Sequence, residues 1–221
     1  YYALKNGHRF VYASSAATYG DGKKGFSDDE SLLKDYEPLN MYGFSKHLFD
    51  LWLQNEGLLD KVVGLKYFNV FGPNENHKGR MASAVFHMYP HAHQEGVVRL
   101  FESSEPNKFA NGGQQRDFIY VKDVARITVE LLSSEVCGLF NLGTGTPHTW
   151  NELGAAVFKG LNLLQNIEYV DMPTDLLGKY QNYTCADMTH LKEALGSLQF
   201  TTFERSVVEY VKDYLVPQKY W

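Results

Sequence analysis

The sequence predicts an α/β fold: a doubly wound parallel sheet, continued by a smaller mixed α/β part. Two short apolar runs, residues 9–13 and 62–70, have the composition of buried strands. Between them, residues 44–53 place apolar side chains at helical spacing, which is typical of a helix packed on a sheet. This strand–helix–strand order predicts parallel strands that bind ligands at their carboxyl ends.

Composition excludes several classes of protein. With 44% hydrophobic and 21% charged residues among 221, the chain is ordinary for a soluble globular protein. The net charge of −5 argues against a nucleic-acid partner, and no apolar run is long enough for a membrane span. We expect a cytoplasmic protein in which Cys137 and Cys185 are buried free thiols.

Further elements follow along the chain. Residues 1–6 resemble the last turns of a helix with no cap or earlier strand, so we expect that N-terminal sequence is missing. Residues 18–39, including Asp28, are expected to form a solvated loop. The second half predicts helices at 82–89 (stopped by Pro90), 124–132, 150–161 (opened by a Thr149–Glu152 capping box) and 203–215, with strands at 97–101, 116–120, 139–142 and 167–170.

Tyr42 and Lys46 are the strongest candidates for chemistry. On a helix they lie one turn apart, and an ammonium beside a phenol favours the phenolate. The Tyr-x-x-x-Lys spacing also occurs at Tyr1 and Tyr19, but only Tyr42 begins an amphipathic helix after a strand that ends in serines. With the hydroxyl of Ser15, the pair predicts proton transfer to or from an alcohol, as in carbonyl–alcohol interconversion.

Two other patterns carry less weight. A dinucleotide pyrophosphate needs a glycine-rich loop after a strand, and no G-x-G-x-x-G occurs; residues 143–145 are interpreted as an ordinary turn. The histidines at 87, 91 and 93 do not predict a metal site, because Pro90 is expected to interrupt their helix.

Seven motifs together resemble the extended short-chain dehydrogenase/reductase superfamily and, within it, the ADP-heptose 6-epimerase family. The similarity runs through nearly all of the chain and is most specific around residues 67–83. It begins at what would be the fourth strand of the family's sheet, in agreement with missing N-terminal sequence. The motifs are residues 12–20 (YASSAATYG), 42–46 (YGFSK), 67–73 (YFNVFGP), 77–83 (HKGRMAS), 116–124 (RDFIYVKDV), 140–145 (FNLGTG) and 178–181 (GKYQ).

The resemblance implies a Rossmann-type sheet and an epimerisation at C6 of the heptose of an ADP-sugar, for lipopolysaccharide core biosynthesis. Transient oxidation by bound NADP would leave a ketone that is reduced from the opposite face. Residues 1–73 would be the remainder of the cofactor domain. Residues 74–221 would be mostly substrate-binding, with segments around 116–148 returning to the cofactor domain. The family also implies a homo-oligomer, and its preference for NADP over NAD cannot be checked in this sequence.

Matching positions imply roles for single residues. Tyr42 is one catalytic acid/base, Lys46 its cofactor-binding neighbour, and Ser15 holds the reacting hydroxyl. Lys78 matches a second acid/base on the other side of the sugar, which suits a hydride delivered to both faces. Tyr42, Lys46, Val70 and Lys78 would contact the cofactor. Substrate contacts would come from Ser15, Asn69, Arg80, His87, Phe101, Glu102, Ser103, Ser104, Arg116 and Tyr180.

Two of these assignments carry a qualification, and one loop stands apart from the family pattern. Arg116 suits a diphosphate, because a guanidinium forms paired hydrogen bonds to phosphate, although a surface salt bridge explains it equally well from sequence alone. Arg80 stands where some relatives have serine, which leaves its role open. Residues 106–115 are insertion-like and are expected to form a loop at the substrate mouth.

Related enzymes supply the alternatives. A 4,6-dehydratase needs an acid/base pair just after the serine-bearing strand, where this chain has Ala16 and Ala17, so dehydration is excluded. A UDP-hexose 4-epimerase stays open, since it needs only the serine, tyrosine and lysine set, but it would not require Lys78. A fragment that binds nucleotide-sugar or subunits without catalysis also stays open.

Overall fold

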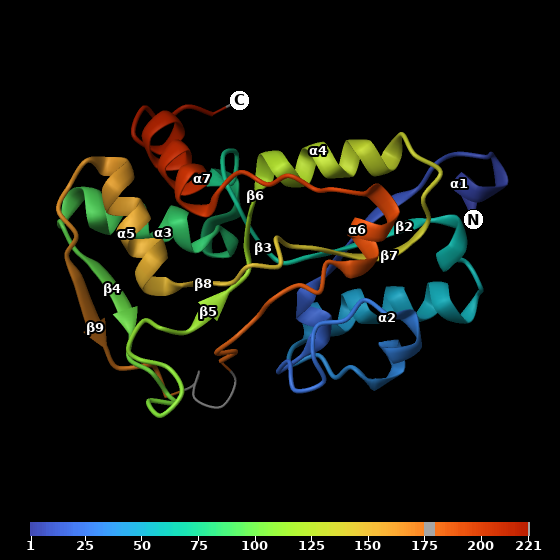
Figure 1. Cartoon of the computed structure of the whole chain (residues 1–221), viewed down its shortest axis with the longest axis horizontal. Helices are drawn as coiled ribbons and strands as arrows, with labels where there is room; N and C mark the ends of the chain where they lie inside the picture. The colour runs from blue at the N-terminus through green and yellow to red at the C-terminus, as the bar shows by residue number, and fades with distance from the viewer. Residues whose placement is uncertain (175–179, 221) are drawn as a thin grey trace.

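The computed structural model describes residues 1–174 and 180–220 and confirms the predicted α/β class. Its central sheet has the parallel order β1-β2-β7, with β1 at Val11–Ser15, β2 at Val63–Tyr67 and β7 at Gly138–Leu142. Helices α2 (Met41–Asn55) and α4 (Val121–Leu132) lie on opposite sides of these strands (Figure 1). The sheet is therefore covered on both faces, as expected for a doubly wound fold.

Strand register aligns the carboxyl ends of the sheet. Ser15 pairs with Tyr67, and Tyr67 pairs with Leu142, so three consecutive parallel strands end at the same level. Ser15 is the last residue of β1, as expected for a strand that ends in serines, although the strand begins two residues later than predicted. The serine therefore stands at the edge where open α/β sheets bind their ligands.

The predicted strand at 62–70 is interrupted at Phe68. The Phe68 amide still donates to Leu142 of β7 (3.1 Å), whereas the Asn69 amide donates to Asp117 (3.0 Å). Strand β3 (Asn69–Phe71) then pairs in parallel with β6 (Phe118–Tyr120). This change of partner leads the chain from the central sheet toward the second part of the molecule.

A second hydrophobic core lies apart from the first. It is built from helices α3 (Ala84–Gln94), α5 (Trp150–Leu161) and α7 (Phe203–Tyr210) with the parallel pair β4 (Val98–Phe101) and β9 (Ile167–Val170) (Figure 1). The predicted Thr149–Glu152 capping box is confirmed, since each side chain bonds the main chain of the other residue.

Short elements complete the chain. The antiparallel pair β5–β8 joins Gln115–Arg116 to His148–Thr149. Among the described residues, no helix is both long enough and apolar enough to cross a membrane. The remaining elements are α1 (Tyr2–Lys5), α6 (Thr189–Leu195), 3-10 turns at Ala16–Tyr19 (η1), Glu30–Asp35 (η2), Leu59–Lys61 (η3) and Asn76–Met81 (η4), and a π-type turn at Val211–Leu215.

Three expectations from sequence are wrong. Pro90 lies inside α3 instead of ending it, because the helix continues past it and buries Ala92 in the second core. Asp28 is not solvated but only 2% exposed, and it accepts a 2.6 Å hydrogen bond from the Asn141 amide. Residues 137 and 185 are free thiols but only partly buried.

Candidate active site

Tyr42 and Lys46 share one face of α2, as predicted. The helix begins three residues earlier than expected because the Asn40 side chain accepts a 2.9 Å hydrogen bond from the Gly43 amide and caps the first turn. Lys46 Nζ lies 5.9 Å from the centre of the Tyr42 ring and donates to the Ala13 carbonyl at 2.9 Å. The ammonium is thus anchored to β1, and the Tyr42 side chain is 51% exposed.

Ser15 ends β1, the strand to which Lys46 is anchored. Its Oγ accepts a 3.1 Å hydrogen bond from the Ala17 amide, which caps the turn η1. A hydroxyl has two lone pairs and one proton, so this bond leaves the proton available for a substrate oxygen. The side chain is 8% exposed and is fixed by the turn that follows it.

Gly43 sets how closely α2 approaches η1. A Cβ at this position would lie 2.6 Å from the Ala17 carbonyl oxygen, a main-chain atom that cannot move aside on its own. We expect Gly43→Ala to destabilise the protein by about 1–3 kcal/mol, as overpacking does, and to lower turnover by moving Tyr42. Urea unfolding and steady-state kinetics measure both effects. Gly154→Ala is the matched control, because the nearest atom there is the flexible Ile167 Cδ1, and a loss as large as that at Gly43 would contradict the argument.

Asn69 and Val70 line a cavity of about 270 Å³ at the start of β3. The Asn69 amide group donates to the Asp117 carbonyl at 3.3 Å and to Thr184 Oγ1 at 3.4 Å. The other walls are Phe68, Phe71, Met81, Ala82, Ser83, Ala84, Val85, Phe118 and Trp150.

The segment carrying Lys78 adjoins this cavity. Lys78 and Arg80 are exposed on η4, which ends at Met81, one of the cavity walls. His87 is exposed on the following helix α3. The structure therefore brings the 78–87 segment next to Asn69 and Val70.

Arg116 is buried rather than part of a surface salt bridge. Its side chain donates to the carbonyls of Gln115 and Gln181, and its guanidinium lies 5.0 Å from the Tyr180 ring and 5.6 Å from the Trp150 ring. Burial lowers the pKa of Arg116. No carboxylate lies within ion-pair distance of it among the described residues, so an anionic ligand would compensate its charge.

Two residues of the run 101–104 lie near Tyr180. The Phe101 and Tyr180 rings meet edge to face at 6.4 Å, and Ser104 Oγ accepts a 3.4 Å hydrogen bond from Asn182. Glu102 is held through its carbonyl by Gln114, and Ser103 through its amide by Asn111. A cavity of about 580 Å³ is lined by Ser104, Tyr180 and residues 108 and 109 of the insertion-like loop. Residues 178 and 179 of the GKYQ motif lie outside the described residues.

Replacing Arg116 by lysine tests this arrangement. Lysine keeps the charge but loses the planar contacts with the two rings and the paired hydrogen bonds. In the full-length protein we expect the Kd of a diphosphate ligand to rise roughly tenfold or more, because hydrogen bonds to charged groups contribute about 1.5–3 kcal/mol. Arg99→Lys, on an exposed arginine paired with Glu95, should leave this Kd unchanged. An equal effect of the two changes would contradict the assignment.

Sequence reasoning missed a buried ion pair next to the candidate residues of α2 and β1. Lys66 Nζ lies 2.8 Å from Asp50 Oδ2, and both side chains are fully buried. Asp50 also accepts from Tyr12 (2.9 Å) and Ser14 (2.7 Å), while Lys66 donates to Thr18 (2.7 Å). Burial lowers the pKa of Lys66, and the Asp50 carboxylate opposes this shift. The signal was visible as a lone lysine within an apolar strand, since a buried charge requires a partner.

This network joins the elements that carry the candidate residues Tyr42, Lys46 and Ser15. Asp50 is one turn after Lys46 on α2, Ser14 precedes Ser15 on β1, and Thr18 belongs to η1. The ion pair and its hydrogen bonds therefore hold α2 against β1 and η1.

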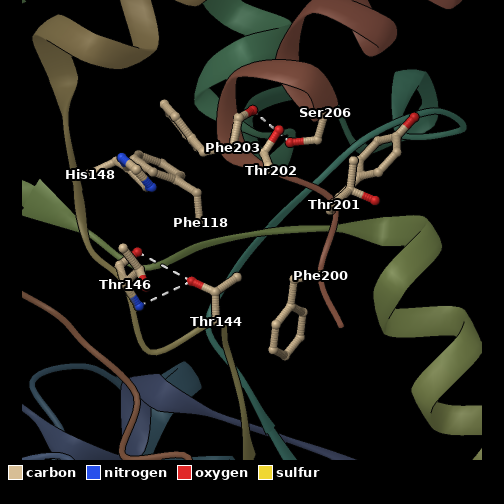
Figure 2. Close-up of a pocket in the computed structure, with 10 residues that line it drawn as sticks. Phe118, Thr144, Thr146, His148, Phe200, Thr201, Thr202, Phe203 and Ser206 are labelled. Atoms are coloured by element: carbon tan, nitrogen blue, oxygen red, sulfur yellow. Dashed lines mark hydrogen bonds between the residues drawn. The ribbon is translucent and has the colours of Figure 1, made fainter. Parts of the chain in front are cut away.

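A separate cavity of about 290 Å³ lies between the loop after β7 and the start of α7 (Figure 2). There the His148 ring stacks on Phe203 at 4.0 Å, and Thr144 Oγ1 bonds both the amide and the carbonyl of Thr146. None of the candidate residues lines this cavity, although Phe118 borders both it and the Asn69 cavity.

The histidines of α3 have other roles. His91 Nδ1 lies 2.7 Å from Glu95, and His93 stacks on Tyr89 at 5.4 Å. In the part of the chain that the structure describes, no three histidine, cysteine or acidic side chains form a group able to hold a metal.

Comparison with known families decides the membership of the chain. Residues 1–143 match the model of the NAD dependent epimerase/dehydratase family. The chain belongs to this family. Membership implies a nicotinamide cofactor, and the donor groups at the sheet edge suit one: Lys46 uses one of its three N–H donors for Ala13 and lies beside the exposed Tyr42 phenol.

Individual family members are similar over almost the whole chain. The ADP-L-glycero-D-manno-heptose-6-epimerase of Nitratidesulfovibrio vulgaris is 53% identical over 96% of this chain and 66% of its own length. The enzyme of the same name from Fusobacterium nucleatum is 41% identical, covering 95% and 66%. The crystal structure of the Helicobacter pylori ADP-L-glycero-D-manno-heptose-6-epimerase superposes with a TM-score of 0.76 at 28% identity, covering 97% and 61%. The chain thus spans about two thirds of the length of these relatives.

Proposed function

We propose that the protein epimerises C6 of the heptose in an ADP-sugar, converting ADP-D-glycero-D-manno-heptose to ADP-L-glycero-D-manno-heptose for lipopolysaccharide core biosynthesis. The observation that carries the proposal is the 53% identity, over 96% of the chain, to a relative of that name. The side chains at the sheet edge support it chemically, because they supply the proton-transfer groups that such a reaction requires.

Each catalytic group has a distinct task. Tyr42 moves the proton of the C6 oxygen on one face of the sugar, and the Lys46 side chain lies beside its ring. Ser15 donates a hydrogen bond to the same oxygen. Lys78 moves the proton when the opposite face reacts, since inversion presents the C6 oxygen on the other side. A bound nicotinamide supplies the oxidising and reducing power; Tyr42, Lys46, Val70 and Lys78 would hold it, and we take NADP rather than NAD from the family resemblance.

The remaining residues bind the substrate. Arg116 neutralises the diphosphate, and the 101–104 run next to it faces the ADP part. Asn69 contacts the sugar, and His87, Tyr180 and Arg80 make further contacts with the substrate, with the part that Arg80 binds left open. Support for this division comes from the burial of Arg116 without a carboxylate among the described residues and from the Asn69 cavity beside the 78–87 segment.

The proposal extends to organisation and location. Residues 1–73 with part of 116–148 would form the cofactor domain and most of 74–221 the substrate domain; two separate hydrophobic cores support this division. We further propose a cytoplasmic homo-oligomer, on the family resemblance.

The test is a product analysis with the full-length protein. Incubation with each ADP-heptose epimer and NADP should give inversion at C6, followed by NMR. Inversion at C4 of a UDP-hexose instead would favour a 4-epimerase. Binding of nucleotide-sugar without turnover of either substrate would favour a non-catalytic role.

A further inference from the structure

Glu75 is a buried carboxylate without a cationic partner. It is 4% exposed, and no lysine, arginine or histidine nitrogen lies within ion-pair distance among the described residues. Three donors satisfy it instead: the Ser83 amide (2.6 Å), Ser83 Oγ (2.6 Å) and Tyr210 OH (2.9 Å). Burying an isolated anion is costly, so these short charge-assisted bonds must offset a considerable penalty.

The three bonds close the segment that carries Lys78. Glu75 directly precedes η4 (Asn76–Met81), and Ser83 follows it as the cap of α3. The Glu75 side chain makes no capping bond to η4 but reaches past it to Ser83. Both ends of the 76–82 segment are thereby fixed to one carboxylate.

Tyr210 ties this closure to the second core. It lies at the end of α7 and is 2% exposed, with its ring centre 6.5 Å from that of Phe71. Burial beside Glu75 raises the pKa of Tyr210, so its hydroxyl remains a hydrogen-bond donor. The segment is therefore anchored to α7 as well as to α3.

Within the closed segment, little else restrains the chain. Lys78 donates its amide to the Glu75 carbonyl (2.9 Å), and the Ala82 amide donates to Gly79 (3.1 Å). Gly79 has φ +53°, a left-handed conformation that permits the reversal between these bonds. Residues 76–81 are exposed, so their conformation depends mainly on how the ends are held.

We propose that Glu75, Ser83 and Tyr210 are positioning residues that hold the Lys78 segment against the Asn69 cavity. The cavity wall continues directly from this closure, since Met81, Ala82 and Ser83 all line it. The inference rests on the proposed role of Lys78 as the second acid/base. A purely structural link between α3 and α7 would affect folding but would not distinguish one face of the sugar from the other.

The test uses that distinction between faces. Oxidation of one epimer starts with proton removal by Tyr42, and oxidation of the other starts with Lys78. With the full-length protein in excess over one epimer at a time, the absorbance of the reduced nicotinamide measures the rate at which that epimer is oxidised. We expect Lys78→Ala to slow the oxidation of one epimer. Glu75→Gln should slow the oxidation of the same epimer roughly tenfold or more, while the rate for the other epimer stays within about twofold of wild type.

Two further variants keep the test decisive. Tyr210→Phe removes one of the three hydrogen bonds and keeps the ring, so it tests the positioning role even if Glu75→Gln does not fold. Glu209→Gln is the matched control, because Glu209 precedes Tyr210 on α7 but bonds Tyr120 and Lys122. Glu209→Gln should leave the ratio of the two oxidation rates as it is in wild type.

The possible failures are distinguishable. If Lys78→Ala slows neither epimer selectively, the two-base function itself is wrong. If Lys78→Ala is selective but Glu75→Gln and Tyr210→Phe slow both epimers equally, or neither, the positioning inference alone is overturned.

Discussion

Lys78→Ala in the full-length protein is expected to lower kcat for C6 epimerisation by about 10²–10⁴-fold, the usual contribution of a general acid or base. Lys78 is exposed on η4 and does not belong to the core, so the free energy of unfolding should hardly change. Lys78 would be only one of four residues that hold the nicotinamide, so the affinity for it, measured by calorimetric titration, should fall much less than the rate. The loss would then lie in the chemical step.

His77→Ala is the matched control for Lys78. It removes an exposed side chain from the same turn without removing the proposed base. We expect nearly full activity for this variant. Near wild-type turnover of Lys78→Ala would remove the two-base proposal and favour an enzyme with a single base.

Asp50→Ala should have the largest effect on stability. It leaves the Lys66 ammonium, whose side chain is fully buried, without its carboxylate, and breaking such a pair costs about 3–5 kcal/mol. Tyr12 and Ser14 also lose their acceptor, so α2 loses two of its hydrogen bonds to β1. Chemical unfolding measures the loss, and turnover should fall with it because Lys46 lies on the same helix.

A double-mutant cycle identifies the cause. Lys66→Met alone should also destabilise strongly, and the combination with Asp50→Ala should cost less than the sum, since no unpaired charge remains. Lys159→Met breaks the exposed pair with Glu204 and should cost no more than about 1 kcal/mol. Strict additivity of the two core changes would contradict the ion-pair explanation.

Sequence patterns were sufficient for elements with a strong local signal. Strand β9 has the predicted bounds, and the capping box opens α5 as expected, because both depend on neighbouring residues. Pro90 and Asp28 were misread, since their environment is set by distant partners: the second core in one case and Asn141 in the other. The change of strand partner at Phe68 likewise depends on β6, about fifty residues later.

The candidate site shows the same contrast between local patterns and contacts of distant residues. Tyr42, Lys46 and Ser15 could be found from spacing, because one helix and the end of one strand carry them. The contact of Arg116 with Tyr180 and Trp150 joins residues far apart in the chain, so the sequence left its burial open. Glu75 was missed altogether, since nothing in its local sequence indicates that Ser83 and Tyr210 bond it.

The fate of deuterium placed at C6 of the ADP-heptose tests the central claim most directly. If the full-length protein acts by transient oxidation, the hydrogen removed from C6 returns to the same carbon. The inverted product formed in ordinary water should then retain its deuterium, as read by NMR. Inversion with loss of the label to solvent would contradict the account, because it would indicate deprotonation and reprotonation of carbon.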